Sequence, residues 1–184
     1  MPCPALPERT ARAALAEHFT PAQLAADLAT FSAEEVWERR VRNDNSGRLA
    51  RYKPAGELGD AQLTCQFIIP SDEVWPATLA DLGPDCPLGL WARRGDRLPQ
   101  LTARAVAVTG NRNATEQALA SAGAFATAVA EAGHTVTATL AYGVDSAAHR
   151  AAALAGRATL AVRRIAVPVD DVLAHRLDGL ATLI

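Results

Sequence analysis

A pattern of strand, glycine turn and helix occurs twice between residues 105 and 156, and it constrains the fold more than any other feature. In the first copy, the β-branched residues Val106 and Val108 lead into a turn at Gly110. An alanine-rich stretch follows and ends at Ala132 and Gly133, and glycine is common just after the last residue of a helix. This copy therefore predicts a strand, a tight turn and a helix.

The second copy has the same order of elements. Residues 134–141 are predicted as a strand, residues 142–145 as a turn, and a helix is predicted from about Ser146 to Gly156. Strands that alternate with helices are typical of a parallel sheet. The sequence therefore predicts an α/β fold, in which ligands bind at the carboxyl ends of the strands.

The loop of the first copy, Gly110–Thr115, has the chemistry of an anion site. Gly110 lets the backbone approach a ligand closely, and the helix that follows offers free amides at its start. Arg112 adds a planar cation that suits phosphate, while Asn111 and Thr115 supply hydrogen bonds or a helix cap. A phosphate group is therefore the expected ligand, although the GxGxxG and GxxxxGK[ST] signatures are absent.

These segments resemble motifs of the DprA/Smf family of DNA-processing proteins. Val106–Thr115 resembles the family's phosphate-binding loop with its G-S/A-R pattern, and Thr139–His149 resembles its SGLAxGIDxxAH motif. Upstream, Phe67–Trp91 resembles the segment that precedes the family's first parallel strand, and Ala158–Val162 resembles a following strand. The resemblance covers residues 66–162, with the motifs in the family's order.

The resemblance implies a Rossmann-like parallel sheet flanked by helices, which binds single-stranded DNA without catalysing a reaction. It further implies a homodimer that protects the DNA and helps to load a RecA-type recombinase during recombination or natural transformation. No cofactor and no metal are implied. The residues expected to bind the nucleic acid or its phosphates are Gly110, Asn111, Arg112, Asn113, Thr115, Tyr142, Gly143, Arg93 and Arg94.

The sequence departs from the family pattern at several positions. Asn111 stands where the family has Ser or Ala, and Thr139 stands where it has Gly. The family fold continues with further strands beyond the position that corresponds to Ile184. We therefore expect a DprA-like domain over residues 66–184 that is incomplete at its C-terminus.

Three other functions fit the same loop. A phosphate site also suits a nucleotide-binding sensor, or a nucleotide-cleaving enzyme similar to the cytokinin-activating LOG enzymes. The PGGxGT-type loop of those enzymes is absent, which argues against nucleotide cleavage. A degenerate family member that keeps the fold but has lost DNA affinity is the third alternative.

The charges of the chain are segregated along the sequence. The formal net charge is −2, but residues 1–90 carry eight basic and thirteen acidic side chains. Residues 91–164 carry nine arginines against four acidic residues, and this segment contains the phosphate-binding loop. Such segregation favours an anionic partner for the basic half, and the alternative is a set of arginines spread over a solvated surface.

The first 53 residues predict a small module of three helices. Pro7 and Glu8 open the first, Thr20-Pro21 with Gln23 open the second, and Ser32 with Glu35 forms a capping box for the third. Turn-forming residues dominate the next segment, so we place a linker at 54–65. The basic residues near the end of the module either face solvent or meet phosphate or a partner: Arg39, Arg40, Arg42, Arg48, Arg51 and Lys53.

Asp145 and His149 lie four residues apart and so share a helix face, which together with Tyr142 suggests an acid–base site. No nucleophile, metal cluster or second carboxylate accompanies them. We therefore expect Asp145 to cap its helix and His149 to pack near the first strand, without catalysis. Trp91 either anchors its segment on the fold or stacks on a base.

The remaining composition points to an intracellular protein. The three cysteines, Cys3, Cys65 and Cys86, are far apart and form no CxxC pair, so neither a zinc site nor a disulfide framework is expected. No signal peptide is recognised at the N-terminus, and no apolar run reaches membrane-spanning length. A cytoplasmic location without membrane contact is the expectation.

Overall fold

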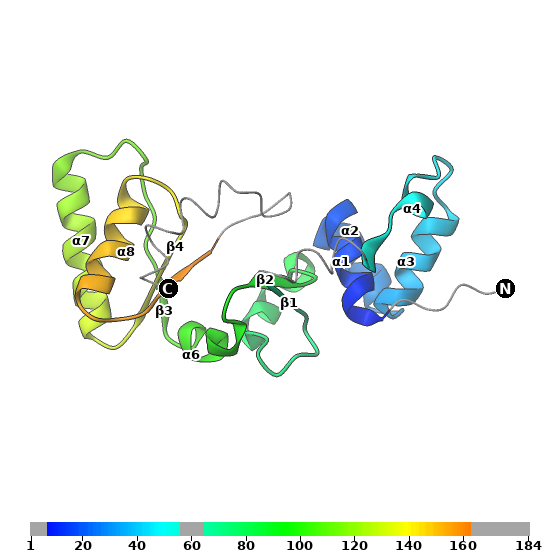
Figure 1. Ribbon diagram of the computed structural model, residues 1–184, viewed down its shortest axis with the longest axis horizontal. Coiled ribbons are helices and arrows are strands. Elements are labelled where there is room, and N and C mark those ends of the chain that lie inside the picture. Colours follow the sequence, from blue (N-terminus) through cyan, green and yellow to red (C-terminus); the bar gives the residue numbers. More distant parts are fainter. Residues whose placement is uncertain (1–6, 56–64, 163–184) are drawn as a thin grey trace. The chain divides into compact units, whose positions relative to one another are not determined.

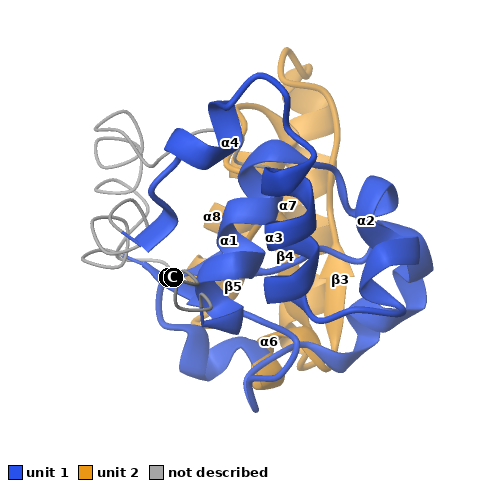
Figure 2. Ribbon diagram, turned by 90° about the vertical axis from the view of Figure 1, so that its right-hand side faces the viewer, with its two compact units in different colours: residues 1–98 blue, residues 99–184 orange. Residues whose placement is uncertain are grey.

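The computed structural model describes residues 7–55 and 65–162 (Figure 1). The chain divides into two units, residues 1–98 and residues 99–184, which Figure 2 shows in different colours. Each unit is described by itself. The sequence also predicts a short strand at 165–169 and a last helix that begins after Asp170 or Asp171, and both lie outside the described residues.

The first unit begins with the predicted helical module. Its helices are α1 (Glu8–His18), α2 (Pro21–Leu28), α3 (Ala33–Arg42) and α4 (Arg48–Arg51). The predicted capping boxes are present: the Thr20 amide donates to Gln23, and the Ser32 amide donates to Glu35. The three predicted helix starts are therefore confirmed: α2 and α3 begin with local hydrogen bonds that the sequence encodes, and α1 follows Pro7 without a side-chain cap.

Large side chains fill the core of this module. Leu15, Leu24 and Val36 are almost fully buried, and Trp37 packs in the same cluster. Leu88, from the second half of the unit, belongs to this cluster as well. The helices and the segment around Leu88 therefore share one core.

A short antiparallel pair of strands completes the unit. The second half contains β1 (Gln66–Ile68), the 3-10 helix η1 (Ala77–Asp85), β2 (Leu90–Ala92) and the short η2 (Gly95–Arg97). Phe67 lies opposite Trp91, and the centres of their rings are 4.9 Å apart. Trp91 is thus held against the strand pair as an anchor, with about a third of its surface exposed.

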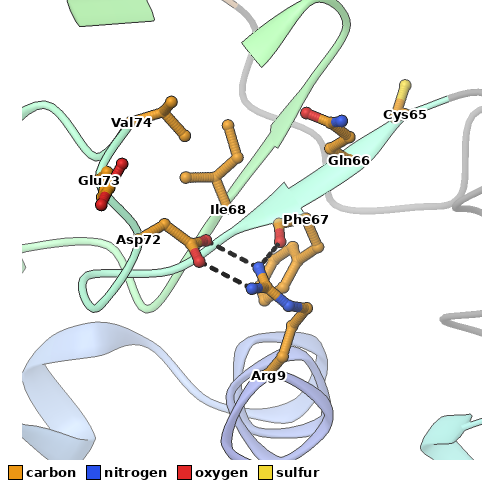
Figure 3. Close-up of a pocket in the computed structure, with 8 residues that line it drawn as sticks. All are labelled: Arg9, Cys65, Gln66, Phe67, Ile68, Asp72, Glu73 and Val74. Atoms are coloured by element: carbon orange, nitrogen blue, oxygen red, sulfur yellow. Dashed lines mark hydrogen bonds and ion pairs between the residues drawn. The ribbon is translucent and has the colours of Figure 1, made fainter. Parts of the chain in front are cut away.

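An ion pair ties the strand pair to the helices. The Arg9 guanidinium, on α1, makes two hydrogen bonds of 2.7 Å to the Asp72 carboxylate and also donates to the Phe67 carbonyl (Figure 3). The Asp72 carboxylate in turn accepts from the Ile69 amide. The Arg9 guanidinium holds the pKa of Asp72 below its usual value.

The compact units divide between Leu98 and Pro99 rather than in the segment 54–65. Within that segment, Pro54 and Ala55 are helical, and residues 56–64 lie outside the described residues. The contact of Arg9 with Asp72 explains the grouping, because it joins the helical module to the strand pair that follows. The division of the chain into domains at 54–65 stays a prediction.

The second unit contains the predicted parallel sheet. After α6 (Leu98–Thr102), which crosses the division, come β3 (Ala105–Ala107), α7 (Glu116–Glu131), β4 (Thr135–Ala138), α8 (Val144–Leu154) and β5 (Thr159–Ala161). The strands lie in the order β3-β4-β5, and both pairs are parallel. The predicted α/β fold is confirmed, although β4 is shorter than the predicted strand and α8 starts two residues earlier than predicted.

Alanine makes up most of the core of the second unit. Ala126 and Ala130 of α7 and Ala148 and Ala152 of α8 are fully buried together with Val136 of β4. The helices α7 and α8 pack against each other and against β4. Because alanine has a small side chain, the two helix backbones can approach closely. No helix in the described part of the chain is long and apolar enough to cross a membrane.

Candidate functional site

The two predicted loops lie together at the carboxyl edge of the sheet. The loop Gly110–Thr115 follows β3, and the turn at Tyr142 and Gly143 follows β4, the neighbouring parallel strand. The Val144 amide donates a 3.3 Å hydrogen bond to the Asn111 carbonyl and so joins them directly. The site is therefore a pair of connected loops, which Figure 1 shows beside the starts of α7 and α8.

Two glycines allow the loops to meet. Gly143 has a φ of +80°, and a Cβ atom there would lie 2.2 Å from the Asn111 carbonyl oxygen. A Cβ atom at Gly110 would lie 2.8 to 3.0 Å from the side chain of Val144. Gly110 is thus required because Val144 packs closely against it, and not for a left-handed backbone. Gly143 must be glycine for two reasons, its positive φ and the close approach of the Asn111 carbonyl.

The buried carboxylate of Asp145 joins the same two loops. Asp145 is 2% exposed, and one of its oxygens accepts a 3.3 Å hydrogen bond from the Gly110 amide. Its other oxygen accepts from the amide and the hydroxyl of Thr139. Asp145 therefore connects the start of the first loop to the end of β4.

The expectation that Asp145 caps its own helix is wrong. The residue before α8 is Gly143, whose geometry provides no side-chain cap, and Asp145 lies inside the first turn. Its carboxylate points to donors in two other segments, and one of these, Gly110, is 35 residues away in sequence. The Gly110 amide is consequently occupied, so the amides that remain for a ligand come from the rest of the loop.

His149 continues this polar network deeper in the unit. It is 2% exposed, with Nδ1 3.0 Å from the Thr159 hydroxyl and Nε2 3.2 Å from the Thr139 carbonyl. Burial lowers the pKa of His149, although the backbone groups of Thr139 and Ala138 and the charge of Asp145 oppose the shift. The imidazole therefore packs between the end of β4 and β5, and not near the first strand as expected.

The outer surface of the loops is polar and exposed. Asn111, Arg112, Asn113 and Thr115 are exposed, and Tyr142 retains 66% of its accessible surface. The Thr115 hydroxyl accepts from the Ala118 amide, which confirms the predicted cap of the helix. Arg112 makes no ion pair within residues 7–55 and 65–162.

Arg93 and Arg94 belong to the first unit, after β2. Both are exposed, and Arg94 is the one described residue other than glycine that has a positive φ, of 54°. This backbone conformation forms the turn before η2. Their participation in the same site as the loops of the second unit stays a prediction.

The arrangement is suited to binding an anion. Two helices begin at this edge, and the amino ends of helices attract negative charge. The buried Asp145 and His149 are saturated by backbone and hydroxyl partners, so their position serves to hold the loops. The described residues include no group of three or more His, Cys, Asp or Glu side chains that could hold a metal ion.

Comparison with known proteins agrees with the motifs. The family model of DNA recombination-mediator protein A matches residues 66–184. Two proteins of Mycobacterium tuberculosis, from strains CDC 1551 and H37Rv, bear the name DNA processing protein DprA and are 33% identical over 160 residues. These alignments cover 77% of this chain and 41% of each relative.

A solved structure shows the same fold. The X-ray structure of DNA processing protein A (DprA) from Streptococcus pneumoniae superposes with a TM-score of 0.56 and 21% identity. The superposition covers 95% of this chain and 60% of that protein. The chain thus spans less than half of the curated relatives' length, and the matched 66–184 include both loops of the candidate site. It belongs to the DNA recombination-mediator protein A (DprA) family.

Proposed function

We propose that this chain binds single-stranded DNA through the loops at the carboxyl edge of its parallel sheet. In this proposal it acts by binding, without turnover, in DNA processing that serves recombination or natural transformation. It protects the bound strand and helps to load a RecA-type recombinase. Family membership supports this role, and the names of the relatives refer to DNA processing.

The observation that carries the proposal is the joined pair of loops, one of which presents the exposed side chain of Arg112. The Arg112 guanidinium is free of ion pairs among the described residues and extends from a backbone that Asp145 and Gly143 hold in place. An arginine fork can make two hydrogen bonds to one phosphate. In the proposal Arg112 pairs with a backbone phosphate, while amides of residues 111–115 add further donors.

The exposed Tyr142 offers a second kind of contact. Tyr142 belongs to the turn that is joined to the phosphate loop by the hydrogen bond from the Val144 amide to the Asn111 carbonyl, and its side chain is exposed. Aromatic side chains stack on bases in single-stranded nucleic acids with little preference for sequence. Phosphate contacts likewise carry no sequence information, so the proposed binding is independent of base sequence.

The remaining parts of the proposal concern assembly and location. We propose a homodimer, because β3 and β5 are the edges of the described sheet and an exposed edge favours pairing or cover. We also propose that the protein acts in the cytoplasm, where a recombinase and incoming DNA meet. Size-exclusion chromatography with light scattering tests the dimer, and a monomer at micromolar concentration contradicts it.

Fluorescence anisotropy with a labelled poly-dT oligonucleotide over a salt series tests the DNA-binding proposal. We expect tight binding that weakens with salt, and we expect Arg112→Ala to lower the affinity and to reduce the salt slope by about 0.7. Arg157→Ala is the matched control, because Arg157 is exposed and precedes β5 at the opposite edge of the sheet. Its affinity and slope should equal those of the unchanged chain.

The same titration separates the alternatives. Duplex DNA and free nucleotides are added as competitors to the bound oligonucleotide. Displacement by one particular nucleotide would favour a nucleotide-binding sensor over a DNA-binding protein. Absence of binding at low salt, from a folded chain, would identify a degenerate family member, and an Arg112→Ala variant with unchanged slope would exclude the proposed phosphate contact.

A further inference from the structure

A second concentration of positive charge lies in the first unit, on the end of α3, the loop that follows and α4. Residues 39–53 contain five arginines and Lys53 but a single carboxylate, that of Asp44. The rest of residues 1–98 is acidic, with thirteen carboxylates against five arginines. Six of the eleven cations of this unit therefore lie within one short stretch of chain.

Most of these cations are exposed and unpaired. The exposed ones form what we call the α3–α4 basic surface, and none makes an ion pair within the described residues: Arg39, Arg42, Arg48, Arg51 and Lys53. Arg40 differs, because its guanidinium bonds to the Asp27 carboxylate at 2.7 Å and to the Gln23 carbonyl. The fold therefore engages one arginine of this stretch in an ion pair and leaves the others available.

Contacts within the module support several of the exposed cations. The Arg39 guanidinium lies 4.2 Å from the centre of the Phe31 ring. The Arg51 guanidinium lies over the loop between the helices, where it donates to the Ser46 carbonyl at 3.5 Å and would contact a Cβ atom at Gly47. Figure 1 shows α3 and α4 adjacent and joined by this loop. The cations are thus attached to one local structure rather than to a tail.

The single carboxylate of the stretch is directed toward the backbone. Asp44 accepts hydrogen bonds from the amide and hydroxyl of Ser46 and, at 2.7 Å, from the Leu49 amide. The Ser46 hydroxyl and then the Leu49 amide hold the pKa of Asp44 below its usual value. Asp44 therefore shapes the loop and forms no ion pair with the neighbouring arginines.

Helix electrostatics explain only part of this arrangement. Cations near the carboxyl end of a helix are favourable, which accounts for Arg39 and Arg42 in the last turn of α3. Arg48 is the first residue of the one-turn helix α4, at the amino end, where this effect does not favour a cation, whereas Lys53 follows the carboxyl end. Helix electrostatics therefore do not account for Arg48.

We propose that the α3–α4 basic surface is a second contact for the phosphate backbone of single-stranded nucleic acid. The choice of ligand rests on the proposed function, but the surface belongs to a different unit from the phosphate loop. Arg42, Arg48 and Lys53 supply charge for phosphates, and the exposed side chains of Asn43, Asn45 and Ser46 add hydrogen-bonding groups between them.

The absence of an apolar centre favours nucleic acid over a protein partner. Protein interfaces bury a core rich in aromatic and aliphatic side chains. The exposed large apolar residues of the described chain are Leu82, Trp91, Phe125, Tyr142, Leu154 and Val162, and none of them lies in residues 39–53. Contact with a phosphate backbone needs no such centre, because release of counterions drives it.

A double variant of the full chain tests the proposal. Arg42→Gln with Arg48→Gln removes two cations whose side chains make no ion pair or hydrogen bond among the described residues, so folding should be unaffected. Arg104→Gln with Arg157→Gln is the charge-matched control, because it removes the same charge at exposed positions before β3 and β5. Arg104 also lies 3.3 Å from His134 Nε2, so circular dichroism checks that this control is folded. In the poly-dT titration we expect the first pair to lose roughly tenfold in affinity and about 1.4 in salt slope, and the control to change neither.

The outcomes distinguish this surface from the phosphate loop. If only Arg112→Ala weakens binding, the surface is excluded and the proposed function remains. If only the α3–α4 variant weakens binding, the surface is supported and the loop contact is excluded. If the unchanged chain does not bind at low salt, both proposals are overturned. A variant that keeps its DNA affinity but loses binding to poly-glutamate would assign the surface to an acidic protein instead.

Discussion

The two units of this chain are stabilised in different ways. The first unit fills its interior with Leu15, Leu24, Val36 and Trp37, whereas the second fills it mainly with alanine. Four polar or charged residues are buried in the described part of the chain, and only Thr10 belongs to the first unit. The other three, Asp145, His149 and Thr159, lie in the second unit. Asp145 bonds to Gly110 of the candidate site, and His149 lies within hydrogen-bond distance of Thr159.

The two kinds of interior determine different properties of the units. Large apolar side chains contribute free energy through the area they bury, but they impose few directional constraints. Hydrogen bonds to a buried carboxylate have defined directions, so they determine where the two loops lie. The second unit therefore depends on buried polar groups for the geometry of its site, and the first unit depends on apolar volume for its stability.

Removing the carboxylate of Asp145 should have the largest effect. Asp145→Ala leaves the amides of Gly110 and Thr139 without their acceptor, and a buried unsatisfied donor costs about 1 to 3 kcal/mol. We expect a loss of about 3 kcal/mol in the free energy of unfolding of the second unit, together with the loss of DNA binding. Hydrogen exchange read by mass spectrometry should show faster exchange in peptides that cover residues 105–115 and 139–149.

The control for this prediction is Glu131→Ala, which removes one negative charge from an exposed position at the end of α7. It should leave exchange and binding unchanged. If Asp145→Ala exchanges like the control, the carboxylate does not hold the loops, and the proposed contrast between the units is wrong.

Opposite changes of side-chain volume should sharpen the comparison. Leu15→Ala opens a cavity in the first unit and should cost about 3 kcal/mol, whereas Ala130→Leu overpacks the second unit and should cost about 2 kcal/mol. All three tryptophans, Trp37, Trp75 and Trp91, lie in the first unit, so their fluorescence reports its unfolding alone. Exchange of peptides from residues 116–154 reports the second unit.

Matched controls are available on exposed positions. Leu154 is 89% exposed, so Leu154→Ala should cost less than about 0.5 kcal/mol. Ala124 is exposed on α7, so Ala124→Leu should be similarly mild. An Ala130→Leu variant as stable as Ala124→Leu would show that the alanine interior has spare volume.

The sequence was sufficient for features that depend on neighbouring residues. The helix starts at Pro21 and Ala33 and the cap at Thr115 follow from local hydrogen bonds, the start at Glu8 follows Pro7, and the alternation of strand and helix predicted the parallel sheet. The large apolar residues of α7 were a poorer guide, because Phe125 is 53% exposed while alanines form the core. Hydrophobicity alone did not show which face of an alanine-rich helix is buried.

Features that depend on distant residues could not be predicted. The role of Asp145 requires Gly110, and the grouping of the first unit requires Arg9 to reach Asp72, a separation of 63 residues. Because an aspartate at the start of a helix often caps that helix, the local pattern predicted the first amides of α8 as the partners of Asp145. Gly143 was the one signal in the sequence that the two loops meet, since its φ of +80° and its lack of a side chain allow the second turn to pack on Asn111.

The smallest of the expected effects concerns pH. Burial lowers the pKa of His149 in the folded chain, so the unfolded chain binds a proton more readily. Stability should therefore decrease as the pH falls below the unfolded pKa of about 6.5 and continue to decrease until the folded pKa is passed. His149→Gln removes this titration and keeps an N–H for the Thr139 carbonyl, so between about pH 7 and pH 5 the variant should lose less stability than the unchanged chain.

The other histidines, His18, His134 and His175, are common to both chains and cancel in the difference. The pH response should appear in exchange of the second unit, whereas the Asp72 carboxylate of the first unit, with its pKa lowered by Arg9, weakens its contact only at more acidic pH, below about pH 4. Equal pH dependence in the two chains would show that the proton does not distinguish the folded from the unfolded state at His149.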